Sequence, residues 1–238
     1  MRLYPLTKDR PKALLPIGGR LMLDYVMDGI QTIPEIDGCV LVTNHRFAGQ
    51  FQDWADGRRD RVPCRIVDDG TDSNENRLGA IGDIVYTVEK AALDDDLLIL
   101  ASDNLFDFPL VDFVNDWKKH GCDCVAVQEM ENVEERRRFA IATLDSDMRI
   151  LSIVEKPKDP PGKMAAYALY LYRRDTLPLF RAYLDGGNPP DSPGNFPVWL
   201  CQRKEMRAYR FEGECVDIGT LESYRAVCEQ YEKKARNV

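Results

Sequence analysis

Apolar residues in the first half of the chain recur in two alternating patterns. Short runs that are apolar throughout are typical of buried strands, and apolar residues at helical spacing are typical of amphipathic helices. We expect strands within 38–44, 62–69, 95–104 and 122–130, and helices within 21–30, 46–55, 78–93 and 109–121. Buried strands separated by helices indicate a parallel sheet covered on both faces, and such sheets bind ligands at the carboxyl ends of their strands.

The second half of the chain has a different pattern. Strand-like segments with short connections at 138–145, 150–156 and 165–173 predict antiparallel additions to the same sheet. We expect a helix at 175–187, a proline- and glycine-rich loop at 188–197, and a closing helix at 220–237. The expected packing face of the closing helix consists of Leu221, Tyr224, Val227, Cys228 and Tyr231. The sequence therefore predicts a single α/β domain over 1–238, built from the halves 1–130 and 131–238.

The composition narrows the classes of function. The 238 residues are 44% hydrophobic and 30% charged, as in globular proteins, and the formal net charge of −8 gives no bulk attraction to nucleic acid or to an acidic membrane. No apolar run reaches the length of a membrane span, and the first residues lack the apolar core of a signal peptide. The 7 cysteines lack the spacing of a zinc set and indicate a reduced, cytoplasmic protein.

Cations and carboxylates stand at positions where they could serve a phosphorylated ligand. Arg2 and Lys12 lie in a proline-rimmed opening segment, and without further context such residues are usually only solvated. Asp103 and Asp217 each follow a predicted strand. Two carboxylates at one edge of a sheet suit Mg²⁺, which binds through one or two carboxylates and substrate phosphates. The ordinary alternative for either aspartate is a turn or a helix cap.

Two further segments carry candidate binding residues. Gly79 opens the predicted helix at 78–93, and a glycine there permits close approach of a ligand to a helix N-terminus that favours anions. Helix packing alone could also explain this glycine. Glu155 and Lys156 end a predicted strand, where adjacent opposite charges are ordinarily an exposed pair that contributes little.

The motifs together resemble the sugar-1-phosphate nucleotidyltransferases, the NDP-sugar pyrophosphorylases that include glucose-1-phosphate thymidylyltransferase. The matching segments run in order as "RLYPLTKDRPKALLPIGGRLMLDY", "LGAIGD", "ASDNLF", "SIVEKP", "AAYALYLY" and "CVDIGTLESY". The resemblance implies an α/β fold with a Rossmann-like, mixed and mainly parallel sheet and helices on both faces. It also implies a nucleotide-binding half over 1–130, and a sugar-phosphate half with a closing helix over 131–238.

The implied reaction condenses an NTP with a sugar 1-phosphate to an NDP-sugar and pyrophosphate, with dTTP or UTP and a hexose 1-phosphate as the expected substrates. By resemblance, Arg2 and Lys12 are catalytic and grip the triphosphate, while Gly79 and Asp103 bind the nucleotide. Asp103 and Asp217 hold Mg²⁺ as the cofactor. The sugar phosphate is bound by Glu155, Lys156 and Ala168. The resemblance also implies that the chain could form a homo-oligomer.

The chain departs from the family pattern at its first residues. In the family a buried strand and a glycine-rich turn precede the arginine, and neither occurs before Arg2. Two explanations are open: the start was assigned too far downstream, which we favour, or the chain is a truncated copy with a rearranged sheet. We expect these residues alone to have low activity, because part of the nucleotide cradle is absent.

Milder departures are Ser102 and Ala168 in place of family glycines, and Cys215 at a position that is often aromatic. Two other functions stay open beside NDP-sugar synthesis. The chain could be a catalytically silent homologue that binds a nucleotide or sugar phosphate and has a regulatory role. It could also be a nucleotidyltransferase that acts on another phosphorylated alcohol.

Overall fold

A computed structural model describes residues 3–73 and 75–236. Its elements in the first half are η1 (Lys12–Leu14), β1 (Pro16–Ile17), β2 (Arg20–Leu21), α1 (Met22–Gln31), β3 (Cys39–Thr43), α2 (His45–Asp56), β4 (Cys64–Asp68), α3 (Ala80–Ala91), β5 (Leu97–Leu100), β6 (Asn104–Phe106), α4 (Leu110–His120) and β7 (Asp123–Glu129). Those in the second half are α5 (Val133–Arg136), β8 (Ala140–Leu144), β9 (Ile150–Glu155), β10 (Met164–Tyr172), η2 (Arg174–Thr176), α6 (Leu177–Asp185), α7 (Asn195–Leu200), β11 (Met206–Arg210), β12 (Cys215–Asp217) and α8 (Leu221–Arg236).

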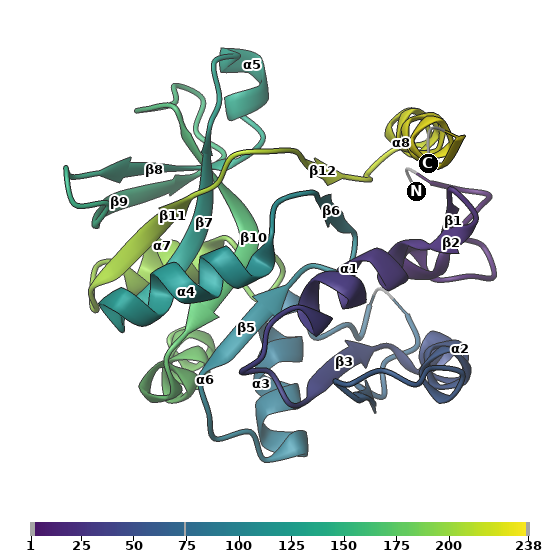
Figure 1. Cartoon of the computed structure of the whole chain (residues 1–238). Coiled ribbons are helices and arrows are strands. Elements are labelled where there is room, and N and C mark those ends of the chain that lie inside the picture. The colour runs from purple at the N-terminus through teal and green to yellow at the C-terminus, as the bar shows by residue number, and fades with distance from the viewer. Residues whose placement is uncertain (1–2, 74, 237–238) are drawn as a thin grey trace.

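The centre of the fold is a 6-stranded sheet in the order β11-β7-β10-β8-β9 (Figure 1). The sixth strand, β5, pairs with the second half of β10, while β8 pairs with its first half. β5 and β7 each run antiparallel to β10, so they share one direction, and β11 is parallel to β7. The predicted mixed α/β sheet is confirmed. Direct pairing within this sheet is mostly antiparallel, however, because β10 from the second half lies between β5 and β7.

The strands β3 and β4 form a separate parallel 2-stranded sheet. Within the described residues no ladder joins this pair to β5, although β3 and β5 are apolar and would suit the middle of a sheet. All residues of both strands are only half-buried.

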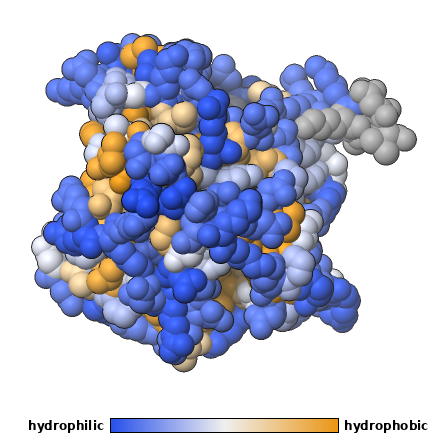
Figure 2. Space-filling model, turned by 60° about the vertical axis from the view of Figure 1, so that its left-hand side comes forward, coloured by the Kyte–Doolittle hydropathy of each residue, from blue (hydrophilic) through white to orange (hydrophobic). Residues whose placement is uncertain are grey.

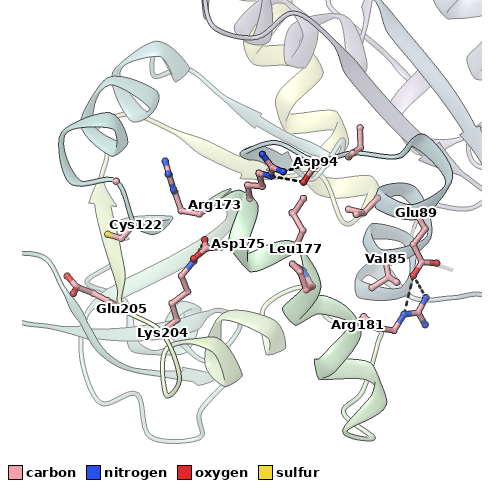
Figure 3. Close-up of a pocket in the computed structure, with 15 residues that line it drawn as sticks. Val85, Glu89, Asp94, Cys122, Arg173, Asp175, Leu177, Arg181, Lys204 and Glu205 are labelled. Atoms are coloured by element: carbon pink, nitrogen blue, oxygen red, sulfur yellow. Dashed lines mark hydrogen bonds and ion pairs between the residues drawn. The ribbon is translucent and has the colours of Figure 1, made fainter.

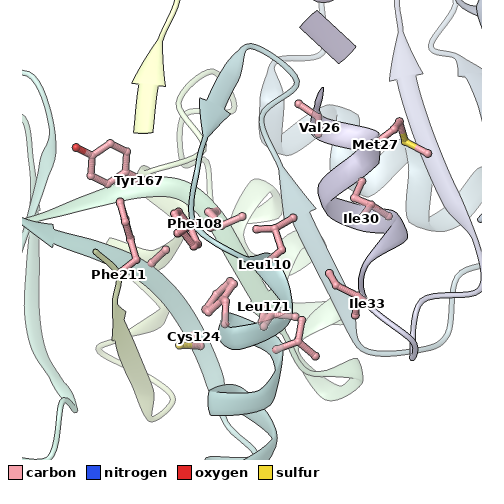
Figure 4. Packing of buried hydrophobic residues seen from close by; sticks show 14 of the residues in the cluster. Val26, Met27, Ile30, Ile33, Phe108, Leu110, Cys124, Tyr167, Leu171 and Phe211 are labelled. Carbon is pink, nitrogen blue, oxygen red and sulfur yellow. The ribbon is translucent and has the colours of Figure 1, made fainter. Parts of the chain in front are cut away.

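Alternating side chains of β7 and β10 supply a hydrophobic core on each face of the central sheet. One face packs against α1 and α4, with Cys124, Leu171 and Phe113 among its buried members (Figure 4). The opposite face packs against α3, α6 and α7, and there Tyr172 and Phe180 are almost fully buried. Both faces of the sheet are therefore covered by helices, as the sequence predicted.

Most of the predicted elements are present, with bounds that shift by a few residues. The segment 188–197 is an exception, because α7 begins at Asn195 inside the loop that we expected. Cys124 and Ala126 lie buried on one face of β7, while Cys122 precedes the strand and is half-buried.

The closing helix α8 packs near the other end of the chain. Val227 of α8 is buried with Ile17 and Met22, and Tyr231 makes an edge-on ring contact with Tyr25 at 4.8 Å between ring centroids. The predicted packing face is thus confirmed for the residues around Val227. The molecular face in Figure 2 is predominantly hydrophilic with scattered apolar patches. None of the described helices combines the length and apolar character needed to cross a bilayer.

Candidate active site

Lys12 is held in place by the backbone of the opening loop. Pro11, Ala13 and Leu14 are buried on either side of it, and the amide of Leu14 donates to the carbonyl of Pro11 at 3.0 Å. The loop is fastened from outside by α2, where the Gln50 amide nitrogen donates to the Asp9 carbonyl at 2.8 Å. These contacts fix the backbone on both sides of Lys12 and so restrict where its half-buried side chain can lie.

Asp103 and Asp217 are brought to that place by the antiparallel ladder of β6 and β12. Asp217 and Asn104 are register partners in this ladder, and the amide of Ile218 donates to the carbonyl of Asp103 at 3.3 Å. Lys12 Nζ lies 2.8 Å from Asp103 Oδ2 and 3.3 Å from Asp217 Oδ1. Residues 91 and 205 positions from Lys12 therefore meet around one ammonium group.

The ion pairs of Lys12 with Asp103 and Asp217 contribute little to stability. The Asp103 and Asp217 side chains are 40% and 61% exposed, and ion pairs this exposed contribute about 0–1 kcal/mol. Two carboxylates that close repel one another unless a cation lies between them. Hard oxygen ligands from two carboxylates suit Mg²⁺ together with substrate phosphates, and the described residues contain no group of 3 or more His, Cys, Asp or Glu that could bind a metal alone.

The carboxylates of this cluster also affect the pKa of Cys215 on β12. Burial first, and then the nearby carboxylate of Asp217, raise the pKa of the Cys215 thiol to about 12. The side chain therefore stays a neutral thiol beside the carboxylates at neutral pH.

Glu155 and Lys156 form a second cluster where β9 ends. Lys156 Nζ lies 3.5 Å from Glu155 Oε1, and the Glu155 side chain is only 20% exposed. The pair is therefore less solvated than an ordinary surface ion pair. Lys156 has a φ of 43°, in the left-handed region that non-glycine residues rarely occupy. Its amide donates to the carbonyl of Phe139 at 3.1 Å, which holds this uncommon conformation.

The segment 190–194 joins Glu155 to Gly79. The Ser192 hydroxyl donates to Glu155 Oε1 at 3.0 Å, and the amide of Ile81 donates to the carbonyl of Pro190 at 2.9 Å. Gly79 has a φ of 78°, and a Cβ there would lie 2.8 Å from the carbonyl carbon and oxygen of Pro190. The glycine is therefore needed for this loop contact, whether or not a nucleotide also approaches its backbone.

Ala168 connects the two clusters through the sheet. It lies half-buried on β10, and its carbonyl accepts from the amide of Ala101 at 3.2 Å, two residues before Asp103. The pairing of β10 with β7 shifts register between Ala166 and Tyr170, which places Ala168 in an irregular stretch of the strand. Lys12 thus contacts Asp103 and Asp217 directly. Glu155 contacts Lys156 directly, and the segment 190–194 connects Glu155 to the helix start at Gly79. Arg2 lies outside the described residues.

Comparison with known proteins identifies the family. The sequence profile of the nucleotidyl transferase family matches residues 1–234. The chain belongs to this family. Among curated relatives, it is 26% identical to a glucose-1-phosphate adenylyltransferase of Geobacillus stearothermophilus over 93% of this chain and 60% of that protein. It is 24% identical to a UTP–glucose-1-phosphate uridylyltransferase of Haloferax volcanii over 92% of this chain and 86% of that protein.

Solved structures of family members share the fold. A UDP-glucose pyrophosphorylase in its apo form superposes with a TM-score of 0.82 at 20% identity, covering 98% of this chain and 94% of the other. The enzyme of that name from Acinetobacter baumanii gives 0.81 at 15% identity, covering 100% and 93%. The chain spans only 60%, 56% and 58% of the length of several curated relatives, two glucose-1-phosphate adenylyltransferases among them.

Sequence reasoning missed the residues that support the family site. Pro190, Ser192 and Gly194 were assigned to a loop without a role, although a Cβ on Gly194 would lie 2.4 Å from Glu155 Oε2. Asp191 also forms a 3.0 Å ion pair with Arg77 before α3. The run of proline and glycine predicts a turn, but its partners lie far away in the sequence, so no local signal reveals the contacts.

Asp83 in the first turn of α3 was also missed. Burial, and then the neighbouring carboxylate of Asp69, raise the pKa of Asp83 to about 6. Its Oδ1 is buried without a hydrogen-bond partner in the described structure. This carboxyl group therefore titrates well above its usual range beside the helix start that carries Gly79.

A cavity of about 800 Å³ lies elsewhere. It is lined by Asp94, Cys122 and other residues that precede β5 and β7, so it opens at the opposite end of these strands from Asp103 (Figure 3). Its cations are already paired, Arg174 with Asp94 at 2.5 Å and Arg181 with Glu89 at 2.5 Å. The cavity is therefore separate from the candidate active site.

Proposed function

We propose that this chain transfers a nucleotidyl group from an NTP to a sugar 1-phosphate. A phosphate oxygen of the sugar phosphate attacks the α-phosphorus in line, the bond from that phosphorus to the bridging oxygen breaks, and pyrophosphate leaves. Such reactions depend on positioning and charge neutralisation, since the protein forms no covalent bond. The observation that supports this proposal is the convergence of Lys12, Asp103 and Asp217 in a member of the nucleotidyl transferase family.

Asp103 and Asp217 could hold a magnesium ion, because their two partly exposed carboxylates approach the same positive charge, the ammonium group of Lys12. Mg²⁺ bound there would neutralise phosphate charge. Lys12 binds the triphosphate and stabilises the charge that develops on the leaving pyrophosphate. Its buried flanking residues keep the ammonium group at the site before the substrate binds, which lowers the cost of ordering it.

The second cluster binds the acceptor. Lys156 takes the phosphate of the sugar phosphate, and Glu155 accepts hydrogen bonds from sugar hydroxyl groups. The partial burial of Glu155 strengthens these hydrogen bonds, since water competes less for a shielded carboxylate. The contact of Ala168 with Ala101 fixes the acceptor strand relative to the loop that carries Asp103.

We expect dTTP or UTP with a hexose 1-phosphate as substrates. Curated relatives carry the names of adenylyl-, guanyl- and uridylyltransferases, so the assay must include every common NTP. The measurement is pyrophosphate release by the full chain with Mg²⁺, using each NTP with glucose, mannose and N-acetylglucosamine 1-phosphates. NDP-sugar formed in the same reactions is identified by mass spectrometry.

Variants connect any activity to this site. Asp103→Ala and Asp217→Ala should each lower the Mg²⁺-dependent rate at least about 10²-fold, the scale of one strong electrostatic contribution in a preorganised site. Asp37→Ala is the matched control, because this exposed aspartate precedes β3 at the other end of the strand from the site. Binding of substrates without turnover would favour the catalytically silent alternative. Turnover that survives both site variants would disprove the proposed metal site.

A further inference from the structure

Two cysteines face one another at the start of the small parallel sheet. Cys39 is the first residue of β3 and Cys64 is the first residue of β4, and the two are register partners in the ladder. Their sulfur atoms lie 3.8 Å apart although the residues are 25 positions apart in the sequence. Both side chains are half-buried.

The usual spacing of paired strands is compatible with the geometry of a disulfide. Neighbouring strands lie about 4.7–4.9 Å apart, which falls within the Cα separation of about 4.4–6.8 Å that disulfides require. The amide of Cys39 donates to the carbonyl of Pro63 at 2.9 Å, and this bond fixes the start of one strand against the other. The sulfurs can therefore come together by rotation of the side chains, without a movement of the strands.

The electrostatics distinguish the two thiols. The hydrogen bond from Cys64 lowers the pKa of Cys39, whereas sharing that bond and burial raise the pKa of Cys64. The thiolate is the reactive form in thiol–disulfide exchange, so Cys39 is the group that attacks first. Cys64 then lies within reach to resolve the product.

We propose that Cys39 and Cys64 form a modification site that a small disulfide, such as glutathione disulfide, converts to an intramolecular disulfide. Cys39 attacks one sulfur of glutathione disulfide, the S–S bond breaks, and one glutathione leaves. Cys64 attacks the protein sulfur of the mixed disulfide, and the second glutathione leaves. The two protein thiols are oxidised, one glutathione disulfide is reduced to two glutathione thiols, and the two protons pass to the leaving sulfurs.

The bond would tie the start of β3 to the start of β4. No ladder of the described residues joins these two strands to the central sheet, so their mutual position depends on their own pairing and on packing. The carboxyl ends of the same strands lead to His45 and Asp68, which form a 2.6 Å ion pair. The disulfide would therefore restrain the β3-β4 sheet, which belongs to the predicted nucleotide-binding half, 1–130.

The test uses the full chain in reduced form, incubated with glutathione disulfide and digested without reduction. Mass spectrometry should find the peptides of Cys39 and Cys64 joined, and dithiothreitol should separate them. Cross-linking restrains the unfolded chain, so the oxidised protein should melt about 5–10 °C higher than the reduced one. Cys39→Ser and Cys64→Ser should each abolish the cross-link and the shift, whereas Cys201→Ser should keep both.

Peptide mapping of the unmutated protein tests the proposed disulfide and does not depend on whether a variant folds. Two free thiols at these positions after treatment that oxidises a control dithiol would overturn the proposal. A cross-link of either cysteine to a different partner would overturn it as well. Neither result would bear on the proposed nucleotidyl transfer, which is measured under reducing conditions.

Discussion

Replacing Gly194 by alanine should displace the carboxylate of Glu155, the proposed sugar-binding group, without harming the fold. A Cβ at Gly194 would lie 2.4 Å from Glu155 Oε2, closer than atoms can approach, and 3.1 Å from its Cδ, which is a tight contact. The backbone itself accepts alanine, because Gly194 has a φ of −66° and a ψ of −19° at the start of α7. The clash is therefore relieved by moving Glu155, the flexible partner.

The size of the effect follows from the hydrogen bonds that Glu155 loses. A hydrogen bond to a charged group contributes about 1.5–3 kcal/mol, so losing one to a sugar hydroxyl should lower kcat/KM for the sugar 1-phosphate about 10–150-fold. The KM for the NTP should stay within about twofold, since Glu155 belongs to the acceptor cluster. Thermal stability should change little, because the gain of about 0.4–1 kcal/mol from alanine at a compatible φ offsets the loss of the hydrogen bond from Ser192 to Glu155.

The assay is the initial rate of pyrophosphate release with each substrate varied in turn, beside a thermal melt. Gly57→Ala is the matched control, because Gly57 has a φ of −73° at the end of α2 and its Cβ would meet only ordinary contacts at 3.5 Å. Equal losses toward both substrates, or a large fall in melting temperature, would refute the reasoning. A crystal structure of Gly194→Ala with Glu155 unmoved would refute it even if the enzyme proved inactive.

Three further substitutions test other parts of the structure. Lys12→Ala should lower kcat about 10²–10³-fold, measured by pyrophosphate release, because the developing charge loses a positioned cation. Asp83→Asn should stabilise the protein at pH 7–8. Burial and Asp69 raise the pKa of Asp83 to about 6 and make its ionisation costly, so the stability of the unmutated protein falls as pH rises from about 4 to 6. Urea unfolding of the variant should not show this dependence on pH. We expect a gain of about 1 kcal/mol after allowing for solvent screening of this half-buried group; an unchanged slope would contradict the assignment. Gly79→Ala should destabilise by about 2 kcal/mol or more in the same melts, through its φ of 78° and the contact with Pro190, and an unaltered midpoint would contradict that contact.

Hydrophobic patterning predicted the layers of the fold because burial on both faces leaves a strong signal. In β7, Cys124 and Val125 point to opposite cores, and the strand reads as a continuous apolar run. The same signal carries no information about pairing partners. It could not show that β10 inserts between β5 and β7, since strand order depends on contacts between residues distant in the sequence.

Local signals also failed where short elements decide the geometry. α7 was predicted as loop because prolines surround it, yet Pro197 lies in its first turn, where a missing amide hydrogen has no cost. β6 and β12 are 3 residues each, too short for periodicity to detect. The positions of Asp103 and Asp217 after predicted strands suggested a shared sheet edge, and the family resemblance assigned both to one magnesium ion. Ser192 and Gly194 had no signal beyond that of a turn.

The arrangement explains how a site can be assembled from segments that share little sequence proximity. Lys12 and Asp217 stand at the two ends of the described chain, and the packing of α8 beside Ile17 holds those ends together. The loop 190–194 performs the same task for the acceptor side, since one short segment contacts both Gly79 and Glu155. Loosening either connection should separate groups that must act on one pair of substrates. Under the proposed function, we therefore expect substitutions in these connections to lower activity as much as substitutions of the charged groups that they position.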